Sequence, residues 1–228
     1  MLCLNLFQNL KKVNILSQGN FNIFNVIFVI LAACVATLGF LYNSTDAILG
    51  SMLVSAITNP LLTFIILFLL NQYSTSFIKL FHFFGLVIVA IIISVWAGYM
   101  NQRYKVFMTP TYEMKARIKI SHVVVDVLLA LLSGFGIGIA ILNKDIVSRV
   151  GFAIILSITP PIINFGLFCG QALFKHINEE KTDKNKEEIQ SLISDGTRSL
   201  ILSALNILAM FLTLFLTLTL LCKTGIRV

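Results

Sequence analysis

Residues 150–166 read VGFAIILSITPPIINFG and place two adjacent prolines, Pro160 and Pro161, in the middle of an unbroken apolar run. Each proline removes a backbone N–H and disrupts the interior of a regular α-helix. An apolar run of this length is typical of a helix that crosses a membrane, where no water replaces a lost hydrogen bond. This stretch therefore predicts a membrane helix that is broken near its centre.

The composition of the whole chain also indicates a membrane protein. Of its 228 residues, 57% are hydrophobic and 12% are charged, and the mean hydropathy is +0.92, which is far more apolar than a soluble domain. Continuous apolar runs exclude a β-barrel, whose strands alternate apolar and polar residues. The predicted fold class is therefore all-α and polytopic, with six transmembrane helices at 23–42, 47–70, 80–100, 121–142, 150–174 and 199–222.

The charges and motifs exclude several classes of function. The net charge is +7, but Lys and Arg gather beside membrane-length segments, so lipid headgroups are their expected counterions rather than nucleic acid. No nucleotide loop, zinc motif or pair of nucleophile and base is readable. We therefore expect no enzymatic activity, no cofactor and no bound metal, in a multi-pass integral protein of the cell (inner) membrane.

A second copy of the proline motif lies about a hundred residues earlier in the chain. Residues 50–64 read GSMLVSAITNPLLTF and align without a gap to GFAIILSITPPIINF at 151–165. The copies fall on the second and fifth predicted spans, so each half contains three helices. Since an odd number of crossings reverses direction, the halves would form two inverted three-helix repeats. Convergence of two apolar helices by composition is the alternative.

The predicted domain organisation follows from these repeats. Residues 1–22 form an N-terminal interfacial segment, 23–222 a single transmembrane domain and 223–228 a C-terminal tail. Within the domain, repeat one covers 23–100 and repeat two covers 121–222. A charged loop at 176–198 joins the last two spans; we expect Gly196 to end a solvated helix there and Thr197 to cap the final span.

The two proline motifs also predict a polar site. Pro60 lies ten residues after Gly50, about 15 Å along the helix and near the bilayer midplane. A proline inside a helix leaves the carbonyl four residues earlier unpaired, which here means Ala56, Leu156 and Ser157. Polar side chains cluster at the same depth, and the predicted binding site comprises Ser55, Thr58, Asn59, Pro60, Ser157, Thr159, Pro160, Pro161 and Asn164.

Such a site suits a cation that sheds its water or a small polar solute, and it lacks the Arg or Lys expected for an anion. Two alternatives remain open. The prolines could be ordinary kinks whose free carbonyls are satisfied by nearby Ser and Thr, or the segments could be re-entrant hairpins rather than full crossings.

The fourth predicted span carries ionisable residues. His122 and Asp126 lie four apart on one face, an arrangement that could relay protons. The alternative is that Asp126 lies at the membrane interface, paired with Arg117 or Lys119. Helix packing is the expected role of three further stripes, which are Ala130, Gly134 and Gly138 on the fourth span, Ala90, Ser94 and Gly98 on the third, and Ser199, Ser203 and Asn206 on the sixth.

Three stretches, ILGSMLVSAITNPL, EMKARIKISHVVVDVLLALLSG and VGFAIILSITPPIINFGL, carry a resemblance to a known family. In order and spacing they resemble the uncharacterised hydrophobic-domain family, a domain-of-unknown-function family of mainly prokaryotic multi-pass membrane proteins. The resemblance covers residues 36–221 and places the family pattern at Gly50, Ser55, Pro60, Arg117, Asp126, Ala130, Gly151, Pro160, Pro161, Asn164 and Asn206. Ala56 and Asn59 stand where the family usually has proline and glycine, so the first break is expected to be less sharp.

The resemblance implies no function, so the functional hypothesis rests on the proline motifs. We expect a small-solute or ion transporter, or a channel-like protein, with its polar site at the two breaks near the midplane. The alternative is a non-transporting membrane scaffold that binds partners or lipids. The expected partners are the lipid bilayer and a small solute or cation, with a homo-oligomer left open and nucleic acid excluded.

Overall fold

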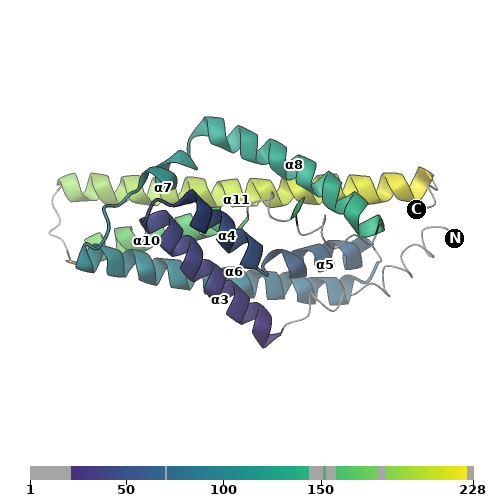
Figure 1. Ribbon diagram of the computed structural model, residues 1–228, viewed down its shortest axis with the longest axis horizontal. Helices are drawn as coiled ribbons and strands as arrows, with labels where there is room; N and C mark the ends of the chain where they lie inside the picture. The colour runs from purple at the N-terminus through teal and green to yellow at the C-terminus, as the bar shows by residue number, and fades with distance from the viewer. Residues whose placement is uncertain (1–21, 70, 144–150, 153–157, 179–182, 225–228) are drawn as a thin grey trace.

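The computed structural model describes residues 22–69, 71–143, 151–152, 158–178 and 183–224, and the elements it forms there are α-helices (Figure 1). This confirms the all-α class. The helices are α3 (Ile23–Leu41), α4 (Thr45–Val54), α5 (Thr58–Leu69), α6 (Tyr73–Tyr104), α7 (Tyr112–Ala116), α8 (Ile120–Leu142), α10 (Thr159–Asn178) and α11 (Asp183–Thr224).

Four of these helices, α3, α6, α8 and α11, are long and apolar enough to cross a membrane. The bent pair α4 and α5 makes a fifth if the two helices are taken as one span. Large apolar side chains remain exposed along their surfaces, as lipid-facing helices require, for example Ile92 at 61% and Leu132 at 64%. The chain is therefore a multi-pass integral membrane protein.

The predicted first, third, fourth and sixth spans coincide with or lie inside these four helices, to within one residue at the ends. Of the predicted fifth span, α10 covers the part from Thr159 onward, and residues 153–157 lie outside the described ranges. The predicted interfacial segment also lies outside them, apart from Asn22. Asn22 caps α3 by accepting a hydrogen bond from the N–H of Phe24 at 3.3 Å.

The second predicted span is broken, as the proline motif suggests. Its two parts, α4 and α5, meet at 47° across three residues, 55–57. Ser55 has an extended backbone with ψ of 121°, which ends α4. The chain therefore leaves the helix before it reaches Pro60 and begins a new helix at Thr58.

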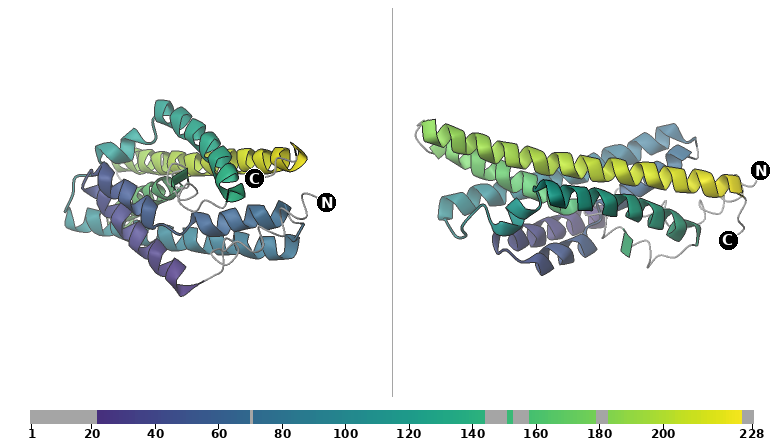
Figure 2. Two further views of the ribbon diagram at one scale, coloured as in Figure 1. Left: turned by 45° about the vertical axis from the view of Figure 1, so that its right-hand side comes forward. Right: turned by 90° about the horizontal axis from the view of Figure 1, so that it is seen from above.

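Helix α10 is the centre of the fold. It packs against α6 and α11 along its length and touches α3 and α4 (Figures 1 and 2). A Cβ atom added at Gly98 of α6 would lie 2.5 Å from the carbonyl oxygen of Leu167 in α10. In return, added Cβ atoms at Gly166 and Gly170 of α10 would meet Ser94 and the backbone of Val95. The small-residue stripe on the third predicted span is thus a helix-packing surface.

Helices α8 and α11 form the other close pair. An added Cβ at Gly134 would lie 2.7 Å from the carbonyl oxygen of Met210, and one at Gly138 would lie 2.8 Å from Cγ2 of Thr217. The later glycine on α8 meets the later residue on α11, so α8 and α11 run in the same direction. The small-residue stripe of the fourth predicted span is confirmed as a packing surface.

The prediction that Gly196 ends a helix is wrong, because α11 continues from Asp183 to Thr224 as one helix of 42 residues. Gly196 instead lets α10 approach, since its added Cβ would lie 3.2 Å from Cβ of Phe168. Thr197 does not cap a new span; its hydroxyl donates to the carbonyl of Ile193 within the same helix at 2.8 Å. A helix of this length measures about 63 Å and extends well past a hydrocarbon core (Figure 2).

Candidate functional site

The two proline motifs meet inside the protein. The hydroxyl oxygens of Ser55 and Thr159 are 2.8 Å apart and share a hydrogen bond, although 104 positions separate them in the chain. Ser55 is the residue that ends α4, and Thr159 is the first residue of α10. The break in the first motif therefore touches the start of the helix in the second.

The prolines lie in first turns of helices rather than in helix interiors. Pro60 is the third residue of α5, and Pro160 and Pro161 are the second and third residues of α10. The first N–H groups of a helix have no acceptor inside the helix, so proline removes donors that would otherwise be unpaired. All three prolines are buried, where an unpaired donor would cost most.

Because Pro60 lies in a first turn, one prediction about unpaired carbonyls is wrong. The carbonyl of Ala56 is not left unpaired by Pro60, because the N–H of Asn59 donates to it at 3.3 Å. The chain turns at 55–57 and uses a tight turn to satisfy that oxygen, so no helix interior is interrupted. Leu156 and Ser157 lie outside the described residues.

The other predicted site residues divide between two places. Thr58 and Asn59 lie half-buried in the first turn of α5, next to the contact between the breaks. Asn164 is fully buried but points elsewhere, since its Nδ2 donates to the carbonyl of Met114 in α7 at 3.0 Å. The predicted group is therefore split, with Asn164 anchoring α7.

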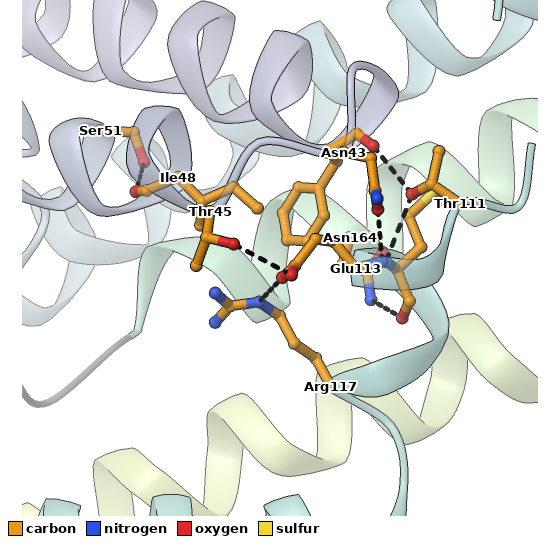
Figure 3. A network of polar contacts seen from close by, with 10 residues as sticks. Asn43, Thr45, Ile48, Ser51, Thr111, Glu113, Arg117 and Asn164 are labelled. Carbon is orange, nitrogen blue, oxygen red and sulfur yellow. Dashed lines mark hydrogen bonds and ion pairs between the residues drawn. The ribbon is translucent and has the colours of Figure 1, made fainter.

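Helix α7 is held by a polar network (Figure 3). The hydroxyl of Thr45 donates to Oε1 of Glu113 at 3.1 Å, and the N–H of Glu113 donates to Oδ1 of Asn43 at 2.9 Å. The hydroxyl of Thr111 caps α7 and donates to the carbonyl of Phe40 at 2.8 Å. Helix α7 is thereby tied to the turn between α3 and α4 on one side and to α10 on the other.

Arg117, just after α7, carries a half-buried positive charge in this network. Its Nε lies 3.7 Å from Oε2 of Glu113, and its guanidinium lies over the ring of Phe40 at 5.7 Å. Burial lowers the pKa of Arg117, while the carboxylates of Glu113 and Asp126 raise it. The guanidinium is thus held by the carboxylate of Glu113 and the ring of Phe40.

The predicted proton pair is not joined by a direct contact in the part of the chain that the structure describes. His122 is exposed and Asp126 is half-buried, and no hydrogen bond or ion pair between them is present there. No ion pair joins Asp126 to Arg117 or Lys119 among these described residues either, although the carboxylate of Asp126 raises the pKa of Arg117. No group of three His, Cys, Asp or Glu side chains that could hold a metal occurs among the described residues.

A polar face of α11 also lies near the contact between the two proline motifs. From the sequence, helix packing is the only role expected for it. The hydroxyl of Ser199 donates to the carbonyl of Pro161 at 3.0 Å, which places this face of α11 against the first turn of α10. Further along the same face, Ser203 and Asn206 are buried, and neither has a hydrogen-bond partner for its side chain. Their spacing, four and then three residues apart, is the sequence signal for a shared helix face.

The comparisons with known proteins identify a family but no functional precedent. The model of a domain of unknown function, DUF389, matches residues 52–212. No curated protein and no solved structure matches the chain. The matched region contains both proline motifs apart from the first residues of the first motif, as well as α7, α8 and the polar face of α11.

Proposed function

The chain belongs to the DUF389 family of domains of unknown function, and from that premise we propose that it is a transporter or channel-like protein for a small solute or ion. The observation that carries this proposal is the hydrogen bond of 2.8 Å between Ser55 and Thr159. It joins the break between α4 and α5 to the first residue of α10, which come from opposite halves of the chain. Broken helices that meet inside a membrane protein commonly form the binding site of a transporter.

The directions of α5 and α10 support an inverted repeat. From the contact between the breaks, α5 runs to the right in Figure 1 and α10 runs to the left. In the proposed arrangement, residues 23–100 and 121–222 form two three-helix units related by a pseudo-two-fold axis in the membrane plane, with six crossings in total. The broken helix of each unit would then begin its second half at the centre of the protein.

The polar groups at the breaks support passage of a solute rather than catalysis. Ser55, Thr58, Asn59 and Thr159 contribute hydroxyls and one amide, without a nucleophile activated by a base. In hydrocarbon such groups must be satisfied by protein, water or a ligand. We propose that the protein is non-catalytic and lies in the cell inner membrane. Its solute would bind at these polar groups as it crosses the membrane.

Flux through liposomes that contain the purified full chain tests the proposal. We expect uptake of at least one ion or small polar solute above that of empty liposomes. Replacing Thr159 with Val keeps the shape of the side chain and removes the hydroxyl that Ser55 contacts. Thr159→Val should lower the flux by about fivefold or more, which corresponds to the loss of roughly one hydrogen bond in the pathway.

Thr197→Val is the matched control, because the hydroxyl of Thr197 is exposed and bonds only within α11. It should leave the flux unchanged. Flux equal to that of empty liposomes over a broad set of ions and metabolites would reject the transport function. Equal flux in Thr159→Val and wild-type protein would place the pathway away from the breaks.

A further inference from the structure

We infer that Ser203 and Asn206 of α11 complete the proposed site and that its ligand is a small uncharged solute with both hydrogen-bond donors and acceptors, such as a polyol or a carboxamide. This inference rests on the proposed function and names the class of its substrate. Both side chains are buried, with Asn206 at 0% and Ser203 at 2% exposure.

Asn206 is the strongest sign of a missing ligand. Neither its Nδ2 nor its Oδ1 has a hydrogen-bond partner, and the Oγ of Ser203 also lacks one. Exchanging the two amide atoms of Asn206 changes nothing, because both are unpaired. Buried polar atoms in folded proteins are nearly always hydrogen-bonded, so a cluster of three without partners points to a bound ligand or an ordered water.

The contacts of α11 on either side place these residues at the level of the breaks. Before them, Ser199 bonds the carbonyl of Pro161 in the first turn of α10. After them, the ring of Phe211 stacks on that of Phe64 in α5, with centroids 6.3 Å apart. Figure 1 shows α5 and α11 running in the same direction, so the start of α5, about 9 Å before Phe64, lies level with Asn206.

The chemistry of the site favours an uncharged ligand. The starts of α5 and α10 present the positive ends of two helix dipoles, which disfavour a cation. The side chains that Ser55, Thr159, Ser203 and Asn206 bring to this level are neutral, so an anion finds no Arg or Lys to pair with. An amide with a free donor and a free acceptor matches a ligand that carries both.

The experiment measures glycerol and urea permeability of liposomes containing the full chain, by the light scattering that accompanies swelling. Na⁺, K⁺, Cl⁻ and water permeabilities are measured on the same vesicles. We expect wild-type protein to pass glycerol or urea. Asn206→Leu, which has the same branched arrangement of side-chain heavy atoms but no polar atoms, should reduce that permeability by about tenfold, the loss that corresponds to roughly one or two net hydrogen bonds.

Two further variants show whether Asn206 acts on the ligand. Ser203→Ala should also lower the solute permeability. Thr217→Val should not, because the buried hydroxyl of Thr217 already donates to the carbonyl of Thr213 at 2.6 Å. The melting temperature of Asn206→Leu should equal or exceed that of wild type, since the substitution removes unpaired buried atoms; a lower melting temperature with reduced permeability would assign Asn206 a structural role instead.

The outcomes separate this inference from the proposed function. Flux of ions with no permeability to glycerol or urea would leave the transport function standing and overturn the substrate class. Permeability to water alone would show that Ser203 and Asn206 bind ordered water only, which also overturns the substrate class. Absence of every flux would reject both proposals.

Discussion

Gly98→Leu is expected to prevent stable folding, because it forces apart the two helices at the centre of the protein. A Cβ at this position would lie 2.5 Å from the carbonyl oxygen of Leu167 and 3.1 Å from its Cα. Both are backbone atoms of α10, so no side chain can rotate away. Overpacking of this kind costs about 3 kcal/mol or more when the backbone must move.

The protein is heated in detergent, and fluorescence-detected size exclusion then measures the fraction that remains monodisperse. Gly85→Leu on the same helix is the matched control, since nothing lies within 4 Å of its added Cβ. Gly85→Leu should behave like wild-type protein. Equal stability of the two variants would show that α6 and α10 do not approach as closely as the structure has them.

The second large effect is expected for Glu113→Ala, which releases α7. The substitution removes the acceptor of the Thr45 hydroxyl at 3.1 Å and the carboxylate 3.7 Å from Arg117. The side chain of Arg117 is only 18% exposed, so its charge would lose its ion-pair partner in a largely desolvated place. We expect the free energy of unfolding to fall by about 2 kcal/mol.

Glu113→Gln separates the charge from the hydrogen bond, because a Gln oxygen still accepts from Thr45 but carries no charge. Its melting temperature in detergent should lie between those of Glu113→Ala and wild type. If the melting temperature of Glu113→Ala equals that of the wild-type protein, the network in Figure 3 does not hold α7.

The sequence predicts the helical spans well because their length and apolarity are properties of local segments. The break in the second span was also predictable, since Pro60 cannot continue a helix that precedes it. Its exact position was not, because Ser55, Ala56 and Ile57 have no strong preference against a helix. The structure ends α4 at Val54 and gives Pro60 a first-turn position instead of a kink.

Local sequence patterns did not predict two features of the fold, the continuation of α11 and the short helix α7, because both depend on tertiary contacts. Gly196 and the charges before it resemble a helix end, but Gly196 packs against Phe168 and the helix continues. Helix α7 has only five residues, too few to show a periodic pattern, although Thr111 is a good N-cap.

For the site, the sequence predicted that Ser55 and Thr159 belong together, and they are in contact. It also grouped Asn164 with them, but five residues along a helix correspond to a rotation of about 140° away from Thr159. Asn164 therefore faces Met114 of α7. The polar face of α11 was visible as a pattern, but its place opposite the breaks depends on the register of α11 with α10, which no local pattern specifies.

A disulfide between the break after α4 and the start of α10 tests most directly whether the two proline motifs meet. In a background with Cys3, Cys34, Cys169 and Cys222 replaced by Ser, a Ser55→Cys, Thr159→Cys variant receives a protease site after Met108, which is 97% exposed. The native hydroxyl oxygens are 2.8 Å apart, close to the separation of about 2.0 Å between the sulfur atoms of a disulfide. The control pair is Leu53→Cys with Thr159→Cys, because Leu53 is 62% exposed on α4.

After oxidation in native membranes and cleavage, we expect the two fragments of the Ser55→Cys, Thr159→Cys variant to stay joined until a reductant is added. The fragments of the control pair should separate without a reductant. Separation of the fragments in both variants would show that Ser55 and Thr159 do not lie side by side.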